Sequence, residues 1–132
     1  MAIVALIEYE DASPEVRAVY DDIRATRKVE WINNFWKGLA SHPPTLERVW
    51  RDVKTVMAPG ALDPLTKEMV YITASIINGC SYCVHSHTAA ATAKGMTREQ
   101  HAELVSIVAL AAKTNQLATA LQVPVDPEFD RG

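Results

Sequence analysis

The chain has 132 residues, of which 48% are hydrophobic and 22% are charged, so it can bury one hydrophobic core but hardly two. It contains five glycines, seven prolines and two cysteines, a composition that excludes collagen-like, disulfide-rich and disordered proteins. The net charge of -3 comes without a cluster of basic residues, which argues against a nucleic acid partner. We therefore expect one globular domain over residues 1–132.

The start of the chain predicts a cytoplasmic protein. Residues 2–7 are apolar, but the acidic Glu8 follows them and no basic residue precedes them, unlike the order found in a signal peptide. No apolar stretch approaches the roughly 18 to 20 residues of a membrane-spanning helix, so no membrane contact is expected. In a reducing compartment, a close cysteine pair is more often catalytic or metal-binding than a structural disulfide.

The first half of the chain predicts three helices, over residues 13–28, 31–40 and 44–58. Ser13 can cap the first of these helices, and Pro14 suits its first helical position. Apolar residues recur at three- and four-residue steps in each segment, which indicates one buried face per helix. We expect the three tryptophans to lie on these buried faces, at Trp31, Trp36 and Trp50.

The second half predicts helices over residues 63–78, 80–94 and 97–113, and a last short helix over residues 115–122. Asp63 repeats the cap-then-proline pattern, and Gly95 suits a left-handed C-cap. Thr97-x-x-Gln100 is a capping box. The apolar residues expected to face inward from the helix that follows are Leu104, Ile107, Val108 and Ala111. The whole chain is predicted to be an all-α, single-domain bundle of about six or seven helices.

Three reactive side chains fall on one face of the predicted helix over residues 80–94. At about 100° per residue, Cys80, Cys83 and His87 lie within roughly 60° of one another. His85 points to another face. His87 follows Cys83 by one turn, so its imidazole can accept the thiol proton and stabilise the thiolate. Both cysteines also lie in the first turn, where unpaired amides and the helix dipole lower a thiol pKa.

Glu68 is the candidate third member of this group. It lies ten residues before Asn78, and His87 lies eight residues after Gly79. If Asn78-Gly79 is a turn between two antiparallel helices, Glu68 and His87 reach similar heights. A carboxylate there could orient the imidazole, directly or through a water molecule.

Metal binding is the alternative interpretation of the same segment. Cys80, Cys83, His85 and His87 are residue types that bind zinc, and they fall within eight residues. One helix cannot arrange four side chains around a tetrahedron, which disfavours a closed structural site. A three-ligand site of Cys80, Cys83 and His87 stays open, as does a non-catalytic redox sensor. We favour cysteine chemistry without metal, haem or other cofactor.

The segment that carries these residues resembles the alkylhydroperoxidase D-like group of the carboxymuconolactone decarboxylase superfamily. The pattern of that group is a glutamate, eleven residues, C-x-x-C, three residues and a histidine, represented here by Glu68, Cys80, Cys83 and His87. Similar flanking sequences extend the resemblance over about residues 30–112. The full pattern is far more specific than C-x-x-C alone.

The resemblance implies an all-helical fold, assembly as trimers or hexamers, and thiol peroxidase activity. Cys83 would attack a hydroperoxide, and Cys80 would resolve the resulting sulfenic acid as a disulfide. His87 would be the base, and Glu68 would complete the proton relay. An external dithiol would then reduce the disulfide. In well-studied relatives this dithiol is a lipoylated protein. Ser81-Tyr82 stands between the cysteines where those relatives carry a pair containing a histidine.

Two further expectations concern the reaction and the assembly. Decarboxylase members of the superfamily lack the cysteine pair, so the lactone reaction is not expected. Apolar residues near the ends of the chain exceed what a lone small bundle needs, and they include residues 2–7, Leu117 and Leu121. The sequence therefore predicts a cytoplasmic, homo-oligomeric peroxidase or disulfide reductase of antioxidant defence.

Overall fold

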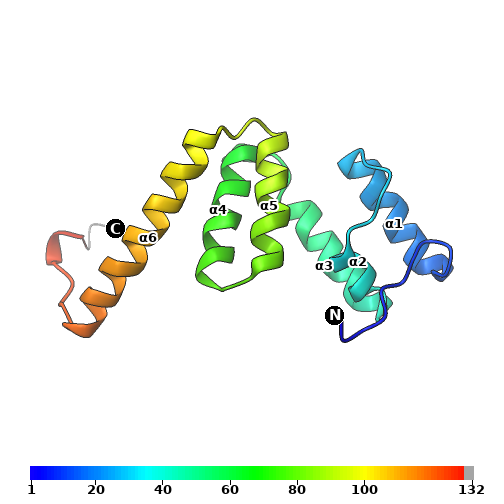
Figure 1. The fold of residues 1–132 in the computed structure, drawn as a ribbon, viewed down its shortest axis with the longest axis horizontal. Helices are drawn as coiled ribbons and strands as arrows, with labels where there is room; N and C mark the ends of the chain where they lie inside the picture. The colour runs from blue at the N-terminus through cyan, green and yellow to red at the C-terminus, as the bar shows by residue number, and fades with distance from the viewer. Residues whose placement is uncertain (130–132) are drawn as a thin grey trace. The chain divides into compact units, whose positions relative to one another are not determined.

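The computed structural model describes residues 1–129, which contain helices and no strand (Figure 1). The elements are α1 (Pro14–Arg27), α2 (Asn34–Leu39), α3 (Pro43–Val56), α4 (Pro64–Ile77), α5 (Ser81–Ala93), α6 (Arg98–Ala120) and a short 3-10 helix, η1 (Pro127–Phe129). The predicted all-α class is confirmed. The helices fall into two compact units, residues 1–58 and a unit that begins at Pro59, and the expectation of a single domain stays a prediction.

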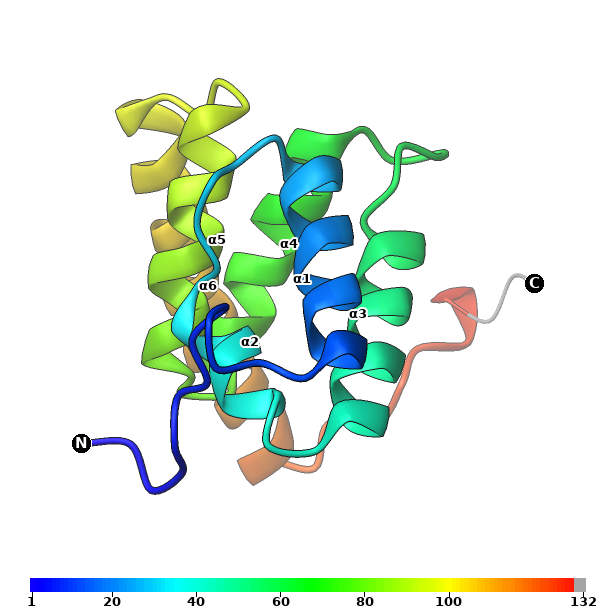
Figure 2. The same ribbon diagram turned by 90° about the vertical axis from the view of Figure 1, so that its right-hand side faces the viewer.

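In the first unit, α1 and α2 both pack on α3. Figure 2 shows α1 and α3 side by side. The core of this unit consists of the apolar faces predicted for these helices, and it includes Val16, Tyr20, Ile23, Trp36, Leu46 and Trp50. The rings of Trp36 and Trp50 meet edge to face, with centroids 5.5 Å apart, an arrangement that aromatic pairs prefer.

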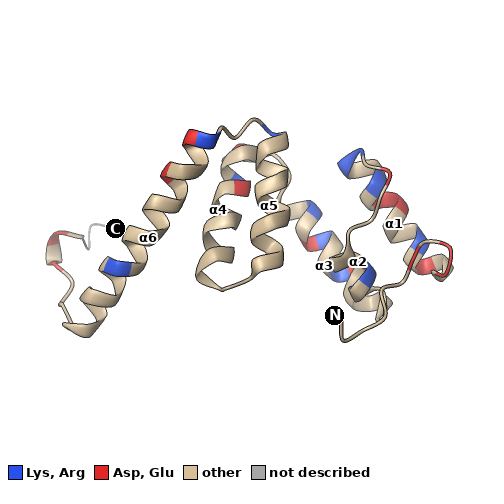
Figure 3. Cartoon of the chain, in the orientation of Figure 1, with Lys and Arg blue, Asp and Glu red and all other residues tan. Residues whose placement is uncertain are grey.

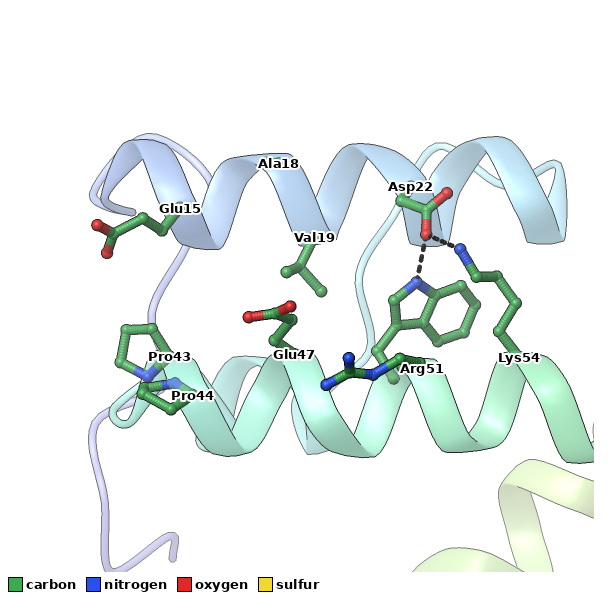
Figure 4. A pocket seen from close by; sticks show the side chains of 10 residues that line it. Glu15, Ala18, Val19, Asp22, Pro43, Pro44, Glu47, Arg51 and Lys54 are labelled. Carbon is green, nitrogen blue, oxygen red and sulfur yellow. Dashed lines mark hydrogen bonds and ion pairs between the residues drawn. The ribbon is translucent and has the colours of Figure 1, made fainter.

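An open groove of about 740 Å³ lies between α1 and α3 (Figure 4). Asp22 of α1 bridges the two helices, because its carboxylate accepts hydrogen bonds from Trp50 Nε1 at 2.7 Å and from Lys54 Nζ. These bonds hold the pKa of Asp22 below its ordinary value. None of the predicted catalytic residues lines the groove. The hydrogen bonds of Asp22 add to the apolar core in holding α1 on α3.

In the second unit, α5 and α6 both pack against α4. The buried residues of this unit are Ile72, Ala91, Met96, Leu104 and Val108. The pair formed by α4 and α5 is poor in charge (Figure 3): α5 has no Lys, Arg, Asp or Glu, and α4 has Lys67 and Glu68. A carboxylate in such surroundings has few possible partners, which makes the neighbours of Glu68 informative.

Local capping explains where most helices begin. The side chains of Ser13, Asn33 and Asp63 each accept a hydrogen bond from a backbone N–H in the first turn of the next helix. Thr97 and Gln100 form the predicted capping box of α6. Among residues 1–129, no helix has both the length and the apolar character required to cross a membrane.

Four details differ from the sequence predictions. The second helix begins at Asn34, not Trp31, because Asn33 caps it, and Trp31 is 65% exposed instead of buried. The predicted break near residue 114 is absent, since α6 runs unbroken from Arg98 to Ala120 through a stretch without glycine or proline. Ile107 on this helix is exposed instead of facing inward.

Candidate active site

The predicted turn between α4 and α5 brings the candidate residues together. Asn78 ends α4, and Gly79 follows with a φ of +69°, a conformation that glycine adopts without steric cost. The N–H of Cys80 then donates to the carbonyl of Ser75 at 3.0 Å. The chain therefore reverses within three residues, and α5 runs back along α4 as the spacing of Glu68 and His87 predicted.

The cysteine pair lies at the N-terminus of α5. Cys80 is the N-cap residue and Cys83 lies in the first turn, as predicted. The two residues form a disulfide, with their Cα atoms 5.3 Å apart. The backbone N–H of Cys83 also points to Cys80 Sγ at 3.3 Å. The dipole of α5 and the N–H of Cys83 favour negative charge on sulfur at this helix end once the disulfide is reduced.

Glu68 and His87 are in direct contact, so their predicted proximity is confirmed. The distance from His87 Nδ1 to Glu68 Oε2 is 2.7 Å, and the two side chains are only 16% and 7% exposed. Because a carboxylate accepts, Nδ1 carries the proton in this hydrogen bond. The other ring nitrogen, Nε2, is then the one that can accept a proton from a neighbouring group.

Lys94 is a third member of the Glu68 contact that the sequence predictions missed. It is the C-cap residue of α5, and its Nζ lies 2.9 Å from Glu68 Oε1. Helical spacing could have indicated it, because Lys94 follows His87 by seven residues, or two turns. Burial alone would raise the pKa of the Glu68 carboxyl, but the hydrogen bonds and charges of His87 and Lys94 outweigh this effect and lower it.

Tyr71 is the second residue that the sequence predictions missed. Its ring stacks on the imidazole of His87, with centroids 3.6 Å apart and ring planes inclined by 20°. Tyr71 follows Glu68 by three residues on α4, so one face of that helix supplies both the carboxylate and the stacking ring. The sequence shows this spacing, but it does not show that the ring of Tyr71 stacks on His87.

His85 lies apart from this cluster, as predicted. Its side chain is exposed, and its Nδ1 donates to the carbonyl oxygen of Ser81, four residues earlier, at 2.8 Å. Within residues 1–129, no group of three or more histidine, cysteine, aspartate or glutamate side chains is arranged to hold a metal ion. The arrangement is suited to redox and proton-transfer chemistry at sulfur, with a buried, ionised carboxylate behind the histidine.

Comparison with known proteins gives three consistent matches. The model of the carboxymuconolactone decarboxylase family matches residues 43–126. The crystal structure of an alkylhydroperoxidase AhpD core from Rhodospirillum rubrum ATCC 11170 has a TM-score of 0.94 and 58% identity, covering 98% of this chain and 97% of that one. An alkyl hydroperoxide reductase AhpD of Solibacter usitatus (strain Ellin6076) is 28% identical over 107 residues, or 79% of this chain and 59% of that protein.

A shorter match is to "Uncharacterized protein 4 in cox locus" of Paracoccus denitrificans, which is 34% identical over 56 residues. This match covers 42% of the present chain and 50% of that protein. The chain thus spans between one half and three fifths of the length of the curated relatives that it matches.

Proposed function

Since the chain belongs to the carboxymuconolactone decarboxylase family, in its alkylhydroperoxidase D-like group, we propose that it reduces hydroperoxides through Cys80 and Cys83. The observation that carries the proposal is the disulfide pair at the start of α5, one turn from a histidine that a buried carboxylate holds. Two relatives support the proposal, because one is named an alkyl hydroperoxide reductase and the other an alkylhydroperoxidase.

The reaction begins with the reduced pair. His87 lies one turn after Cys83 on α5, and its Nδ1 is committed to Glu68. Nε2 therefore takes the proton of the Cys83 thiol, giving a thiolate beside an imidazolium. The ionised Glu68 stabilises the imidazolium, and the N-terminus of α5 stabilises the thiolate.

The Cys83 thiolate then attacks the terminal oxygen of the hydroperoxide. An S–O bond forms, the O–O bond breaks, and the alkoxide that leaves takes the proton from His87 Nε2. The products are an alcohol, or water when the substrate is hydrogen peroxide, and a sulfenic acid on Cys83. His87 returns to its neutral form, so the proton taken from the thiol ends on the leaving group.

Cys80 completes the oxidative half of the cycle. Its sulfur attacks the sulfenic sulfur of Cys83, the S–O bond breaks, and the hydroxyl leaves as water with the thiol proton of Cys80. This step gives the disulfide present in the structure. An external dithiol, for which a lipoylated protein is our candidate, then reduces the disulfide and is itself oxidised, which returns two electrons to the pair.

We also propose that the protein is a cytoplasmic homo-oligomer, a trimer or hexamer. Several apolar side chains stay exposed in the single chain, among them Ile3, Leu117 and Leu121. Exposed apolar surface of this kind is typical of subunit contacts. Light scattering after size-exclusion chromatography measures the mass of the assembly, and a monomer at micromolar concentration would contradict this part of the proposal.

The roles of the two cysteines are tested by peroxide oxidation of wild type, Cys80→Ser and Cys83→Ser, with thiol titration and mass spectrometry. Wild type should form the Cys80–Cys83 disulfide, and Cys80→Ser should trap a sulfenic acid on Cys83. Cys83→Ser should be inert at the same peroxide concentration. Reaction in Cys83→Ser together with an inert Cys80→Ser would reverse the assigned roles.

The same samples distinguish the alternative functions. One zinc ion per chain in the purified protein, with unreactive thiols, would favour a metal site of Cys80, Cys83 and His87. Oxidation by peroxide without turnover in the presence of a dithiol such as dihydrolipoamide would favour a redox sensor. Sustained peroxide consumption driven by the dithiol is the result that the proposed function requires.

A further inference from the structure

The imidazole of His87 is held on two sides by α4. Glu68 binds its edge at Nδ1, at 2.7 Å, and the Tyr71 ring covers one of its faces, with 3.6 Å between centroids. Among residues 1–129, the Tyr71 side chain makes this ring contact and no hydrogen bond. The contact therefore depends on the aromatic ring and not on the hydroxyl.

The two contacts fix different degrees of freedom of the imidazole. A hydrogen bond to Nδ1 alone leaves the ring able to rotate about the axis through that bond. A near-parallel ring against its face, inclined by 20°, removes this rotation and excludes water from that face. The direction of Nε2, the nitrogen that exchanges a proton with Cys83 in the proposed reaction, is then set by Glu68 and Tyr71 together.

We propose that Tyr71 is a positioning residue that orients His87 and stabilises its protonated form beside the Cys83 thiolate. This inference rests on the proposed function for its role in turnover, but the effect on thiol reactivity exists without turnover. The face of an aromatic ring attracts a cation, so the stack favours the imidazolium over the neutral imidazole. A protonated His87 in turn stabilises the reactive thiolate of Cys83.

Tyr71 is suited to this role by its place on the surface of the unit. The residue is 36% exposed, so it is not a core residue whose replacement would collapse the helix pair. Among the titratable side chains near the imidazole, Glu68 binds it directly and Lys94 binds Glu68, while Cys83 lies one turn before His87 on α5. Replacing the tyrosine leaves the carboxylate, the lysine and both cysteines in place.

The test compares Tyr71→Leu, which removes the aromatic ring, with Tyr71→Phe, which removes only the hydroxyl. The reduced, full-length proteins are alkylated with iodoacetamide across a range of pH, and the rate at Cys83 is followed by fragment mass spectrometry. Tyr71→Leu should slow alkylation at neutral pH about two- to fivefold and move the midpoint of the profile to higher pH. Tyr71→Phe should match the wild type.

Circular dichroism checks that each variant is folded, and Tyr71→Met replaces Tyr71→Leu if the latter is not. A non-aromatic variant with the wild-type alkylation profile would overturn the proposal, and so would Tyr71→Phe with as large a defect as Tyr71→Leu. Peroxide consumption is measured in parallel. If the wild type consumes none while the alkylation profiles still differ as expected, the proposed function fails and the positioning role of Tyr71 stands.

Discussion

His87 and Glu68 are 19 residues apart in sequence and 2.7 Å apart in space, joined by a hydrogen bond from Nδ1 to Oε2. The bond crosses from α5 to α4 and is mostly screened from water, since the Glu68 side chain is 7% exposed. It selects the tautomer of the histidine, because an ionised carboxylate can only accept. The chemistry proposed at Cys83 therefore depends on a residue of the neighbouring helix.

Glu68→Gln should lower kcat/KM for hydroperoxide at least about tenfold. The amide can present an N–H to His87 in place of an acceptor oxygen, which favours the tautomer in which Nε2 carries the proton. Glu103→Gln is a matched control, because Glu103 is an exposed residue of α6. Equal kcat/KM values for the two variants would show that the Glu68 contact does not serve the reaction.

Glu68 should also make the stability of the fold depend on pH in a defined direction. Its pKa in the folded protein is lowered from the ordinary value of 4.5, so the folded state favours the ionised carboxylate. The resulting stabilisation is fully present above pH 4.5 and is lost as the pH falls through the lower, folded pKa. Urea unfolding of wild type and Glu68→Gln should show a stability difference that is largest near neutral pH and shrinks below this value.

Comparison with Glu68→Gln isolates this effect from other carboxyls. Asp22, Asp63 and Glu99 also have lowered pKa values, and their contributions are lost on acidification in both proteins alike. A stability difference that stays constant from pH 7 to about pH 3 would mean that Glu68 is not selectively stabilised in its ionised form.

The parts of the fold that depend on local sequence could be predicted. A cap residue bonds to an amide only two or three positions away, so Ser13, Asp63 and the pair Thr97 and Gln100 mark helix starts without reference to the rest of the chain. The nearness of Glu68 and His87 was predictable for a related reason. A tight turn at Asn78-Gly79 places residues at similar distances before and after it at similar heights on the two helices.

The parts that depend on contacts between helices could not be predicted in the same way. The sequence places Tyr71 and Lys94 on the correct helix faces. Their contacts are with residues of the neighbouring helix, since Tyr71 stacks on His87 and Lys94 binds Glu68. Trp31 was predicted to be buried because it falls on the apolar stripe of the expected helix over residues 31–40. The Asn33 cap leaves Trp31 outside α2, so that stripe does not include it, and of the two residues before the cap Ile32 is buried and Trp31 is exposed.

Gly79→Ala should destabilise the protein by about 1 to 2 kcal/mol, because its φ of +69° is unfavourable for residues with a Cβ atom. A Cβ at this position would meet no atom of a non-adjacent residue within 4 Å, so the cost is one of backbone conformation and not of steric overlap with neighbours. Urea unfolding measures it.

Gly38→Ala provides a matched control for Gly79→Ala. Gly38 lies inside α2, and a Cβ there would meet Val4 and Leu6 at ordinary contact distances of 3.7 and 3.8 Å. Alanine in a helix is favoured over glycine by roughly 0.5–1 kcal/mol, so this variant should be neutral or more stable. Similar losses in both variants would argue against the strained turn as the cause.

Lys94→Met tests the ion pair behind the proposed relay. Lys94 is 39% exposed whereas its partner Glu68 is 7% exposed, so water screens the pair and its loss should cost only about 1 kcal/mol. The pKa of Glu68 should rise toward its ordinary value, because Lys94 contributes both a hydrogen bond and a positive charge that lower it. The loss of stability that Glu68 causes on acidification still begins near its ordinary pKa of 4.5, but it should be smaller than in the wild type and complete at a higher pH. Lys113→Met removes the same charge at an exposed position of α6 and should leave the pH dependence of stability unchanged. An identical change in both variants would assign the effect to net charge instead of to the contact with Glu68.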